Sequence, residues 1–345
     1  MSTTIASTAA QAAAPAALPV FPRPSAAEFG AAGAYMRLPQ FGVIDVAGDD
    51  AATFLHSQLT NDIEHLDAAS ARLAGYCSPK GRLLASFLAW RAGHDVRLLV
   101  SKDVQPAAQK RLSMFVLRAK AKLTDASDAL AVVGFAGDVR SALSGIFDAL
   151  PDGVHAKVDG PAGALIRLPD ADGKPRYLWI GPRDEVDARL AALDGKLAAV
   201  SPAVWDWLAI RAGQPRITQP AVEQFVPQMV NFDVIGGVNF RKGCYPGQEI
   251  VARSQYRGTI KRRTALAHVA GDTDTVHAGV ELFHSDDPGQ PCGMIVNAAA
   301  APGGGVDVLA EIKLAALDSG SVHLGAADGP ALAFEALPYA WPTEV

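Results

Sequence analysis

The spacing of apolar residues predicts alternating strands and helices in the first third of the chain. Runs rich in β-branched residues indicate strands, and apolar residues three and four positions apart indicate amphipathic helices. A Ser-Pro-Lys-Gly sequence at 78–81 predicts a tight turn between two of these strands. The predicted elements are a strand at 41–48, a helix at 51–60, a hairpin at 71–90, a strand at 96–101 and a helix at 103–119 with Leu112, Phe115 and Val116 facing inward.

The pattern repeats more loosely from residue 130 and changes after residue 263. Ser201 is the expected N-cap of one further helix, with Pro202 in its first turn and Gly213 at its end. Beyond residue 263 the pattern consists of short strands separated by Gly, Asp and Pro, which predicts an antiparallel barrel or sandwich after an α+β body. The predicted elements are strands at 130–137, 164–169 and 176–181, helices at 138–150, 183–193 and 202–213, and short strands at 264–271, 279–285, 292–300 and 306–317.

Composition, charge and cysteine content limit the classes of protein to which this chain can belong. The 345 residues are 49% hydrophobic and 19% charged, which suits a globular protein of two or three modules. The formal net charge of −5 argues against nonspecific nucleic-acid binding by the whole surface. The widely spaced Cys77, Cys244 and Cys292 fit neither a disulfide scaffold nor a structural zinc site, and they indicate a reducing compartment.

Residues 1–33 are rich in Ala, Ser, Thr and Pro, and we expect a disordered tail there. The segment lacks a basic n-region and an unbroken apolar core, which argues against a signal peptide. Its first positive side chain is Arg23, which argues against a mitochondrial presequence. No window matches a membrane span. We therefore expect a cytoplasmic protein with no membrane partner.

Candidate chemistry is concentrated in residues 239–263. Cys244 follows Lys242 and precedes a Tyr-Pro-Gly turn, and a short helix is predicted from Gly247. Cationic neighbours and a helix N-terminus favour the thiolate form of a cysteine, so an activated thiol is one interpretation. A small buried hydrophobe, the usual state of a free cysteine, is the other.

The basic residues from Arg253 to Arg263 admit three interpretations. They form a solvated surface, a site for a carboxylated or phosphorylated ligand, or an RNA contact, although aromatic residues are sparse beyond Tyr256. Trp205 and Trp207 lie two positions apart on a predicted helix, so either one of them lines a pocket or both pack in the interior. Walker, GxGxxG-turn, HExxH and GxSxG motifs are absent, and we expect the eight histidines to be surface or core residues.

The sequence KGCYPGQE at 242–249 resembles the K-G-C-Y-x-G-Q-E signature of the YgfZ family of folate-binding proteins. The likeness extends over both sides of the signature, from about residue 35 to the C-terminal strands. The further matching segments are Gln58-Leu59-Thr60-Asn61-Asp62, Pro79-Lys80-Gly81, Ala212-Gly213-Gln214-Pro215, Phe225-Val226-Pro227-Gln228, Gly236-Gly237-Val238, Val251-Ala252-Arg253, Arg257-Gly258 and Lys261-Arg262.

The family is similar to the aminomethyltransferase (glycine-cleavage T-protein) fold. The resemblance implies an α+β folate-binding body of two subdomains and a C-terminal antiparallel β-barrel. The implied boundaries are a folate-binding subdomain at 34–128 and 200–260, a second α/β subdomain at 129–199, and the barrel at 261–345. The resemblance also implies tetrahydrofolate binding and a role in assembly or repair of iron–sulfur clusters, which supports cluster-dependent enzymes including tRNA-modifying ones.

Site residues follow from the same resemblance. It assigns the functional thiol to Cys244 with Lys242 beside it, and Cys244 is also a candidate ligand to a transient cluster shared with a partner. Cys77 either faces the same site or packs inside its strand. Expected partners are iron–sulfur assembly proteins, client iron–sulfur enzymes and folate, and not nucleic acid. The candidate folate-contacting residues are Tyr245, Gln248, Glu249, Arg253, Arg257, Arg211, Trp207 and Asn61.

Two features depart from aminomethyltransferases. Leu84 and Ala85 stand where those enzymes use an aspartate, and Arg211 replaces a pterin-contacting glutamate. Without this carboxylate, the side chain that would transfer a proton at an aminomethyl nitrogen is missing. We therefore favour an accessory protein over a conventional enzyme. A folate-dependent one-carbon (aminomethyl or methyl) transferase is the first alternative, and a tRNA-binding module is the second.

Overall fold

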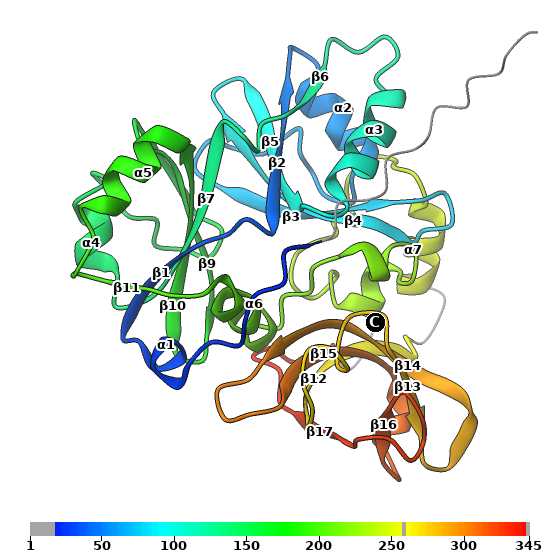
Figure 1. Ribbon diagram of the computed structural model, residues 1–345. Helices are drawn as coiled ribbons and strands as arrows, with labels where there is room; N and C mark the ends of the chain where they lie inside the picture. Colours follow the sequence, from blue (N-terminus) through cyan, green and yellow to red (C-terminus); the bar gives the residue numbers. More distant parts are fainter. Residues whose placement is uncertain (1–17, 257–259, 343–345) are drawn as a thin grey trace, which may run out of the picture.

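The computed structural model describes residues 18–256 and 260–342, which form three sheets arranged around a common centre (Figure 1). The first sheet lies at the top of Figure 1, the second at the left and the third at the bottom. The predicted α+β body followed by an antiparallel C-terminal unit is confirmed. No helix in the described ranges has the length and apolar character needed to cross a membrane.

The first sheet is antiparallel, with strand order β3-β4-β5-β2-β6. Its strands are β2 (Phe41–Ala47), β3 (Ala71–Cys77), β4 (Leu83–Ala92), β5 (Asp95–Ser101) and β6 (Lys122–Asp125), and its helices are α2 (Ala51–Gln58) and α3 (Gln105–Met114). Apolar side chains of both helices, such as Leu55 and Leu112, share one buried cluster with strand residues such as Phe87. The helix predicted at 103–119 is shorter than expected, because it ends at Met114 and Leu117 adopts a left-handed φ of 43°. Phe115, predicted to face inward, is consequently 43% exposed.

The second sheet has the order β11-β1-β7-β10-β9-β8. It consists of β1 (Gly33–Arg37), β7 (Leu130–Gly137), β8 (Lys157–Gly160), β9 (Gly163–Ala171), β10 (Lys174–Pro182) and β11 (Ala198–Ala199), accompanied by α4 (Arg140–Ser144) and α5 (Arg183–Ala191). Strand β1, which the predicted boundaries placed in the first subdomain, pairs antiparallel with β7. The pairing sets Tyr35 opposite Phe135, with ring centroids 6.3 Å apart, so the second sheet begins near the N-terminus.

The prediction of a disordered tail through residue 33 is wrong for residues 18–33. Ser25 and Glu28 form a capping box that starts α1 (Ala26–Gly30). Phe29 on this helix is buried, and its ring packs edge-on against Trp207 with centroids 5.2 Å apart. Apolar burial and helix capping therefore order this segment, whereas the rest of the predicted tail, residues 1–17, lies outside the described residues.

The third sheet is antiparallel, with strand order β16-β13-β14-β15-β12-β17. A bridge between His323 and Ala331 brings the two ends of the sheet together, so it curls into a half-barrel, visible at the bottom of Figure 1. Its elements are β12 (Arg262–Val269), β13 (Glu281–His284), β14 (Asp287–Ala300), β15 (Val306–Lys313), the 3-10 helix η3 (Leu314–Leu317), β16 (Val322–Leu324) and β17 (Leu332–Glu335).

Helix α6 (Pro202–Arg211) lies at the centre, between the three sheets (Figure 1). Its predicted N-cap is confirmed, because the Ser201 hydroxyl accepts a hydrogen bond from the Ala203 backbone N–H at 3.3 Å. The chain then passes through the 3-10 helices η1 (Gln219–Ala221) and η2 (Pro227–Val230) to α7 (Gln248–Tyr256). One buried cluster joins Trp205 and Leu208 of α6 to apolar residues of all three sheets. The centre of the molecule is thus one continuous core.

Candidate functional site

Cys244 lies in a loop at 239–247, the thiol loop, which leads into α7. Of the three free cysteines, Cys244 is exposed, whereas Cys77 and Cys292 are buried. The interpretation of Cys244 as a small buried hydrophobe is therefore wrong. An exposed thiol is accessible to a partner or a small electrophile.

Lys242 fastens the thiol loop to the C-terminal end of α2. Its Nζ donates a hydrogen bond to the Leu59 carbonyl at 2.8 Å and another to the His56 carbonyl, and it lies 4.9 Å from the centroid of the Tyr245 ring. These carbonyls belong to the last turn of a helix, where a cation is favourable. Burial lowers the pKa of Lys242 to about 8, against the opposing attraction of Asp62 and Cys244. Lys242 thus anchors the thiol loop to α2, and its pKa is lowered to about 8.

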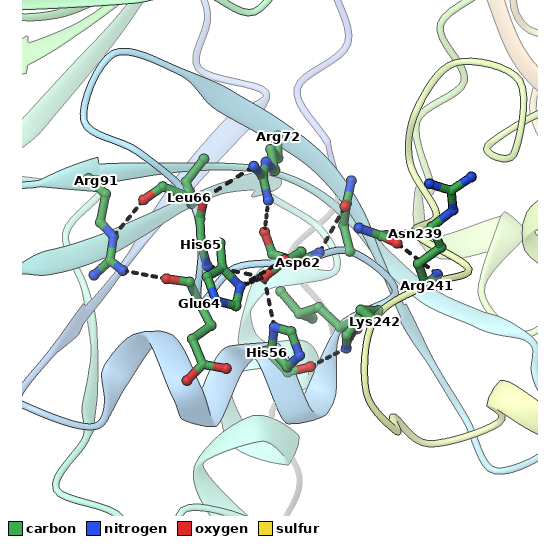
Figure 2. A network of polar contacts seen from close by, with 12 residues as sticks. His56, Asp62, Glu64, His65, Leu66, Arg72, Arg91, Asn239, Arg241 and Lys242 are labelled. Carbon is green, nitrogen blue, oxygen red and sulfur yellow. Dashed lines mark hydrogen bonds and ion pairs between the residues drawn. The ribbon is translucent and has the colours of Figure 1, made fainter.

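A histidine–aspartate cluster lies beside the thiol loop (Figure 2). Asp62 Oδ1 lies 2.9 Å from His56 Nδ1, and Asp62 Oδ2 lies 3.0 Å from His65 Nδ1. Although burial raises the pKa of Asp62, hydrogen bonds from the His65 backbone and from both imidazoles hold it below its usual value. The opposite ring nitrogen of His56 faces the loop, since a Cβ built on Gly243 would lie 3.7 Å from it. Sequence reasoning missed this cluster, because no metal-type spacing marks its histidines.

Asn61, a predicted folate contact, supports the backbone that enters the thiol loop. Its amide nitrogen donates to the carbonyls of Gly236 and Leu73, each at 2.7 Å. The neighbouring Thr60 hydroxyl donates to the Gly237 carbonyl at 2.6 Å, and the Asn239 N–H donates to the Thr60 carbonyl at 2.9 Å. Both amide hydrogens of Asn61 are therefore occupied by backbone.

Tyr245 and Cys77 lie on the interior side of the thiol loop. Both belong to the central buried cluster, and burial raises the pKa of each, to about 12 for Cys77. Cys77 adds to the rise in the pKa of Tyr245. Cys77 is thus a packed strand cysteine, whereas Cys244 faces solvent.

The remaining predicted residues of the signature lie on or beyond α7. Gln248 is half-buried at the start of this helix, and Glu249 and Arg253 are exposed. Arg257 lies outside the described residues. Of the basic run, Arg262 pairs with Glu311 at 2.8 Å.

Arg263 also has a carboxylate partner, because it makes a bidentate contact with Asp233 at 2.6 and 2.9 Å. Both side chains of this pair are 3% exposed. The C-terminal end of the basic run therefore holds the half-barrel to the body, and its guanidinium groups are already engaged.

Trp207 and Arg211 of α6 face the half-barrel. Trp207 Nε1 donates to Asp307 Oδ2 at 2.8 Å, and Arg211 Nη1 lies 2.7 Å from Glu335 Oε2 and 3.5 Å from Asp307 Oδ2. Both residues were predicted to contact folate. Their polar atoms instead tie α6 to β15 and β17.

A cavity of about 100 Å³ lies between α6 and the first two sheets, and one of about 510 Å³ lies between α6 and the half-barrel. Both are lined by Asp206, Ala209, Gln214 and Arg216. We call them together the central cavity. Trp205, the other tryptophan of α6, lines the smaller part. None of Asn61, Trp207, Arg211, Tyr245, Gln248, Glu249 and Arg253 lines either part.

The polar lining of the central cavity was missed by sequence reasoning. Asp206 Oδ1 accepts hydrogen bonds from Gln40 Nε2 and Arg216 Nη2, each at 3.2 Å. Burial raises the pKa of Asp206 and outweighs the attraction of Arg216. Behind them Arg176, fully buried, donates to Gln214 Oε1 at 2.5 Å, and burial lowers its pKa to about 9. The one available signal was the pair of tryptophans on α6, of which Trp205 turns toward the cavity.

Two α/β subdomains, a C-terminal half-barrel and a cavity at their junction define an aminomethyltransferase-like fold. The crystal structure of the glycine cleavage system aminomethyltransferase T from Bartonella henselae is similar to this chain with a TM-score of 0.70 and 16% identity, covering 89% of this chain and 86% of that one. No protein-family model matches the chain. The likeness confirms the predicted fold class.

The chain belongs to the YgfZ family. It is 34% identical over 278 residues to the tRNA-modifying protein YgfZ of Edwardsiella ictaluri, covering 79% of this chain and 82% of that protein. It is 30% identical over 309 residues to the protein of the same name from Sodalis glossinidius, covering 88% and 92%. The resemblance based on KGCYPGQE is thereby confirmed.

Proposed function

We propose that this chain is a tetrahydrofolate-binding accessory protein in iron–sulfur cluster assembly or repair, with Cys244 as its functional thiol. The observation that carries the proposal is that the signature cysteine is exposed, in a loop that Lys242 clasps to α2. Relatives carry the name tRNA-modifying protein. In our proposal that effect is indirect, because the client enzymes that modify tRNA depend on clusters.

Cys244 offers a single thiol, which limits the number of bonds that this site can make to a cluster. An iron–sulfur cluster commonly takes four protein ligands, so Cys244 supplies one thiolate and the partner protein supplies the others. Ligation needs loss of the thiol proton, and His56 lies against the same loop with its Nδ1 bound to Asp62. His56 is therefore the nearby group suited to take that proton. No electron transfer is required for this ligand exchange.

Tetrahydrofolate would occupy the central cavity and not the surface of α7. The larger part of the cavity, about 510 Å³, falls within the usual range for small-molecule sites, roughly 300–1,000 Å³. Its walls combine apolar side chains with a few polar groups, the usual composition of such sites. Arg253, exposed on α7, would then be a surface residue in this proposal.

The test combines ligand titration with complementation. Tetrahydrofolate is titrated calorimetrically into the wild-type protein and the Cys244→Ala variant, and we expect both to bind with similar affinity. In a strain lacking its own YgfZ protein, we expect Cys244→Ser to fail to restore the activity of iron–sulfur enzymes, whereas Cys292→Ser, at a buried thiol in the half-barrel, restores it. Full restoration of enzyme activity by Cys244→Ser would refute the role of Cys244 as the functional thiol. Absence of folate binding would refute tetrahydrofolate as the ligand of this protein.

One observation favours a folate-dependent one-carbon transferase as a second candidate. Leu84 and Ala85 offer no carboxylate, but Asp206 places a carboxyl group with a raised pKa in the central cavity. Such a group can exchange a proton with a bound amine. Catalytic transfer of the one-carbon unit of an aminomethyl donor to tetrahydrofolate, with release of the amine and of the donor's leaving group and lost in Asp206→Asn, would establish this activity. The tRNA-binding alternative loses support, because Arg262 and Arg263 of its expected footprint are ion-paired.

A further inference from the structure

Exposed apolar side chains gather where α3 ends. Among the described residues, three of the eight large apolar side chains that are exposed lie within four consecutive positions. They are Met114, Phe115 and Leu117, which are 62%, 43% and 87% exposed. Single exposed apolar residues are ordinary on a protein surface, whereas a cluster of them marks a place of contact with a partner. The end of α3 is therefore a candidate contact surface.

The backbone of this segment holds the cluster outward. The turn that links α3 to β6 lies at the outer edge of the molecule, near the top of Figure 1. Leu117 adopts a φ of 43°, which is strained for a bulky residue and turns the chain away from the helix. The Lys120 N–H donates to Asp50 Oδ2 at 2.7 Å, and the Asp50 N–H donates to the Lys120 carbonyl at 3.1 Å. Leu112 on the other side of the cluster is fully buried, so the turn is anchored at both ends.

The same segment is strongly basic. Residues 110–122, which we call the α3 tip, contain five basic residues and no acidic one, in a chain whose formal net charge is −5. The five are Lys110, Arg111, Arg118, Lys120 and Lys122. The guanidinium carbon of Arg111 lies 5.9 Å from the centroid of the Phe115 ring. Lys120 lies 3.6 Å from Asp49, but both side chains are largely exposed, so an external anion can compete for this lysine.

The composition of the α3 tip favours one class of partner over two others. Single-stranded nucleic acid stacks its bases on aromatic rings, but the two most exposed apolar side chains, Leu117 and Met114, are not aromatic. A protein interface of standard size buries about 1,200–2,000 Å² and is depleted of lysine, whereas this cluster is small and three of its five basic residues are lysines. An anionic phospholipid surface suits both features, because apolar side chains enter the acyl boundary while lysine and arginine stay at the headgroups.

We propose that the α3 tip attaches the protein reversibly to a membrane surface rich in anionic phospholipid. Met114, Phe115 and Leu117 enter the interface, and the basic residues around them contact lipid phosphates. Such attachment is peripheral and needs no membrane-spanning segment. It departs from the expectation of no membrane partner, which depends on the absence of a spanning window and does not concern contact through a surface turn. It is also independent of the function proposed for Cys244.

The experiment measures partition of the full chain onto vesicles by cosedimentation. One preparation is phosphatidylcholine alone, and the other contains equal parts of phosphatidylcholine and phosphatidylglycerol. We expect partition onto the anionic vesicles to be about 10-fold or more stronger, because each basic side chain at the surface contributes a factor of about 5. Raising the NaCl concentration from about 0.05 M to about 0.5 M should weaken it about 10-fold or more, since salt screens exposed charges.

Two matched pairs of variants locate the contact. Leu117→Ser removes the most exposed apolar side chain of the α3 tip and should weaken partition about 10-fold or more. Val154→Ser, at a side chain that is 57% exposed between α4 and β8, should leave partition unchanged. Arg118→Gln should weaken partition onto anionic vesicles about 5-fold, whereas Lys196→Gln, also at an exposed position, should not. Circular dichroism establishes that each variant is folded.

A tryptophan in the α3 tip reports its insertion directly. In Phe115→Trp, we expect the emission of the added indole, taken as the difference from wild type, to shift to shorter wavelength when anionic vesicles are added. Brominated acyl chains should quench this emission, because the ring moves from water into the acyl boundary. In the control Val154→Trp, neither change is expected.

Each outcome supports or overturns the proposal. Weaker partition of both Leu117→Ser and Arg118→Gln, together with the emission shift in Phe115→Trp, would support it. Partition that neither substitution weakens would place the membrane contact elsewhere, and equal partition onto both kinds of vesicle would refute the recognition of anionic lipid. Absence of partition at low salt would also overturn the proposal. Binding of a single-stranded RNA oligonucleotide that Phe115→Ser weakens would then assign the α3 tip to nucleic acid, and absence of both would leave a protein surface as its partner.

Discussion

Gly81 and Gly247 pack against each other backbone to backbone. Gly81 has a φ of 70° and Gly247 a φ of 80°, a left-handed conformation that residues with a side chain rarely adopt. A Cβ on Gly247 would lie 2.7 Å from Gly81 Cα and 2.4 Å from the Ser78 carbonyl oxygen. The turn at 78–81 therefore interlocks with the end of the thiol loop. This contact sets the position of Cys244 relative to the first sheet.

Gly247→Ala should therefore destabilise the protein. The left-handed conformation costs about 1–2 kcal/mol with a Cβ, and overpacking against backbone costs about 1–3 kcal/mol. We expect the free energy of unfolding, measured by urea denaturation, to fall by about 2–5 kcal/mol. Gly243→Ala in the same loop is the matched control, because its Cβ would meet His56 Nε2 at an ordinary 3.7 Å. Equal stability of the two variants would show that the glycine contact does not hold the loop.

Lys242 makes stability depend on pH in a defined direction. Its pKa is about 8 in the folded chain, against 10.5 ordinarily. Between these values the unfolded chain binds a proton that the folded chain has released, so the contribution of Lys242 to the free energy of unfolding rises with pH. The difference between wild type and Lys242→Met should grow by no more than about 2 kcal/mol from pH 7.5 to 9.5, because partial exposure limits the effect. Urea denaturation at both values measures it.

The control for this experiment is Lys80→Met. Lys80 is exposed in the neighbouring turn, so its removal should shift stability equally at both pH values. If the difference in the free energy of unfolding between wild type and Lys242→Met stays constant, or shrinks, as the pH rises from 7.5 to 9.5, burial does not lower the pKa of Lys242 as described.

The basic run contains both structural and surface arginines. Arg263→Gln leaves Asp233 buried without its partner, and breaking a buried ion pair costs about 3–5 kcal/mol. Arg253→Gln, at an exposed position on α7, should change stability by less than about 0.5 kcal/mol. Thermal and chemical denaturation of the two variants compares them directly. A similar small effect from both would mean that the Arg263–Asp233 pair is open to solvent.

Local signals in the sequence predicted most elements correctly. The Ser-Pro-Lys-Gly turn, the Ser201 cap and the end of α6 near Gly213 all depend on backbone preferences of a few consecutive residues. The pairing of β1 with β7 depends on contacts between distant segments, so no local pattern indicated it. The inward orientation of Phe115 failed for a related reason. Periodicity continued past Met114, but the backbone leaves the helix there.

The candidate site shows the same difference between features that a local sequence signal predicts and features that depend on contacts between distant segments. Cys244 could be found because its signature is contiguous, and its exposure agrees with a functional thiol. The lining of the central cavity could not be found, since Asp103 and Thr218 come from separate segments that meet only in the folded chain. The same holds for His56 and Asp62, which meet because the chain turns after α2. Arg211 and Trp207 were assigned to folate by position in the chain, but their polar atoms face Asp307.

The difference between Cys244 and Cys77 gives a prediction about thiol chemistry. Cys244 is exposed, whereas Cys77 is 1% exposed and burial raises its pKa to about 12. A thiol must ionise and be accessible to react. In the native protein at pH 8, titration with Ellman's reagent should therefore show one rapidly reacting thiol, which Cys244→Ser removes. Cys77→Ala should retain the rapid phase, and all three thiols should react in denaturant. A second rapid thiol that disappears in Cys77→Ala would instead place Cys77 at the same accessible site, where the two sulfurs could act together.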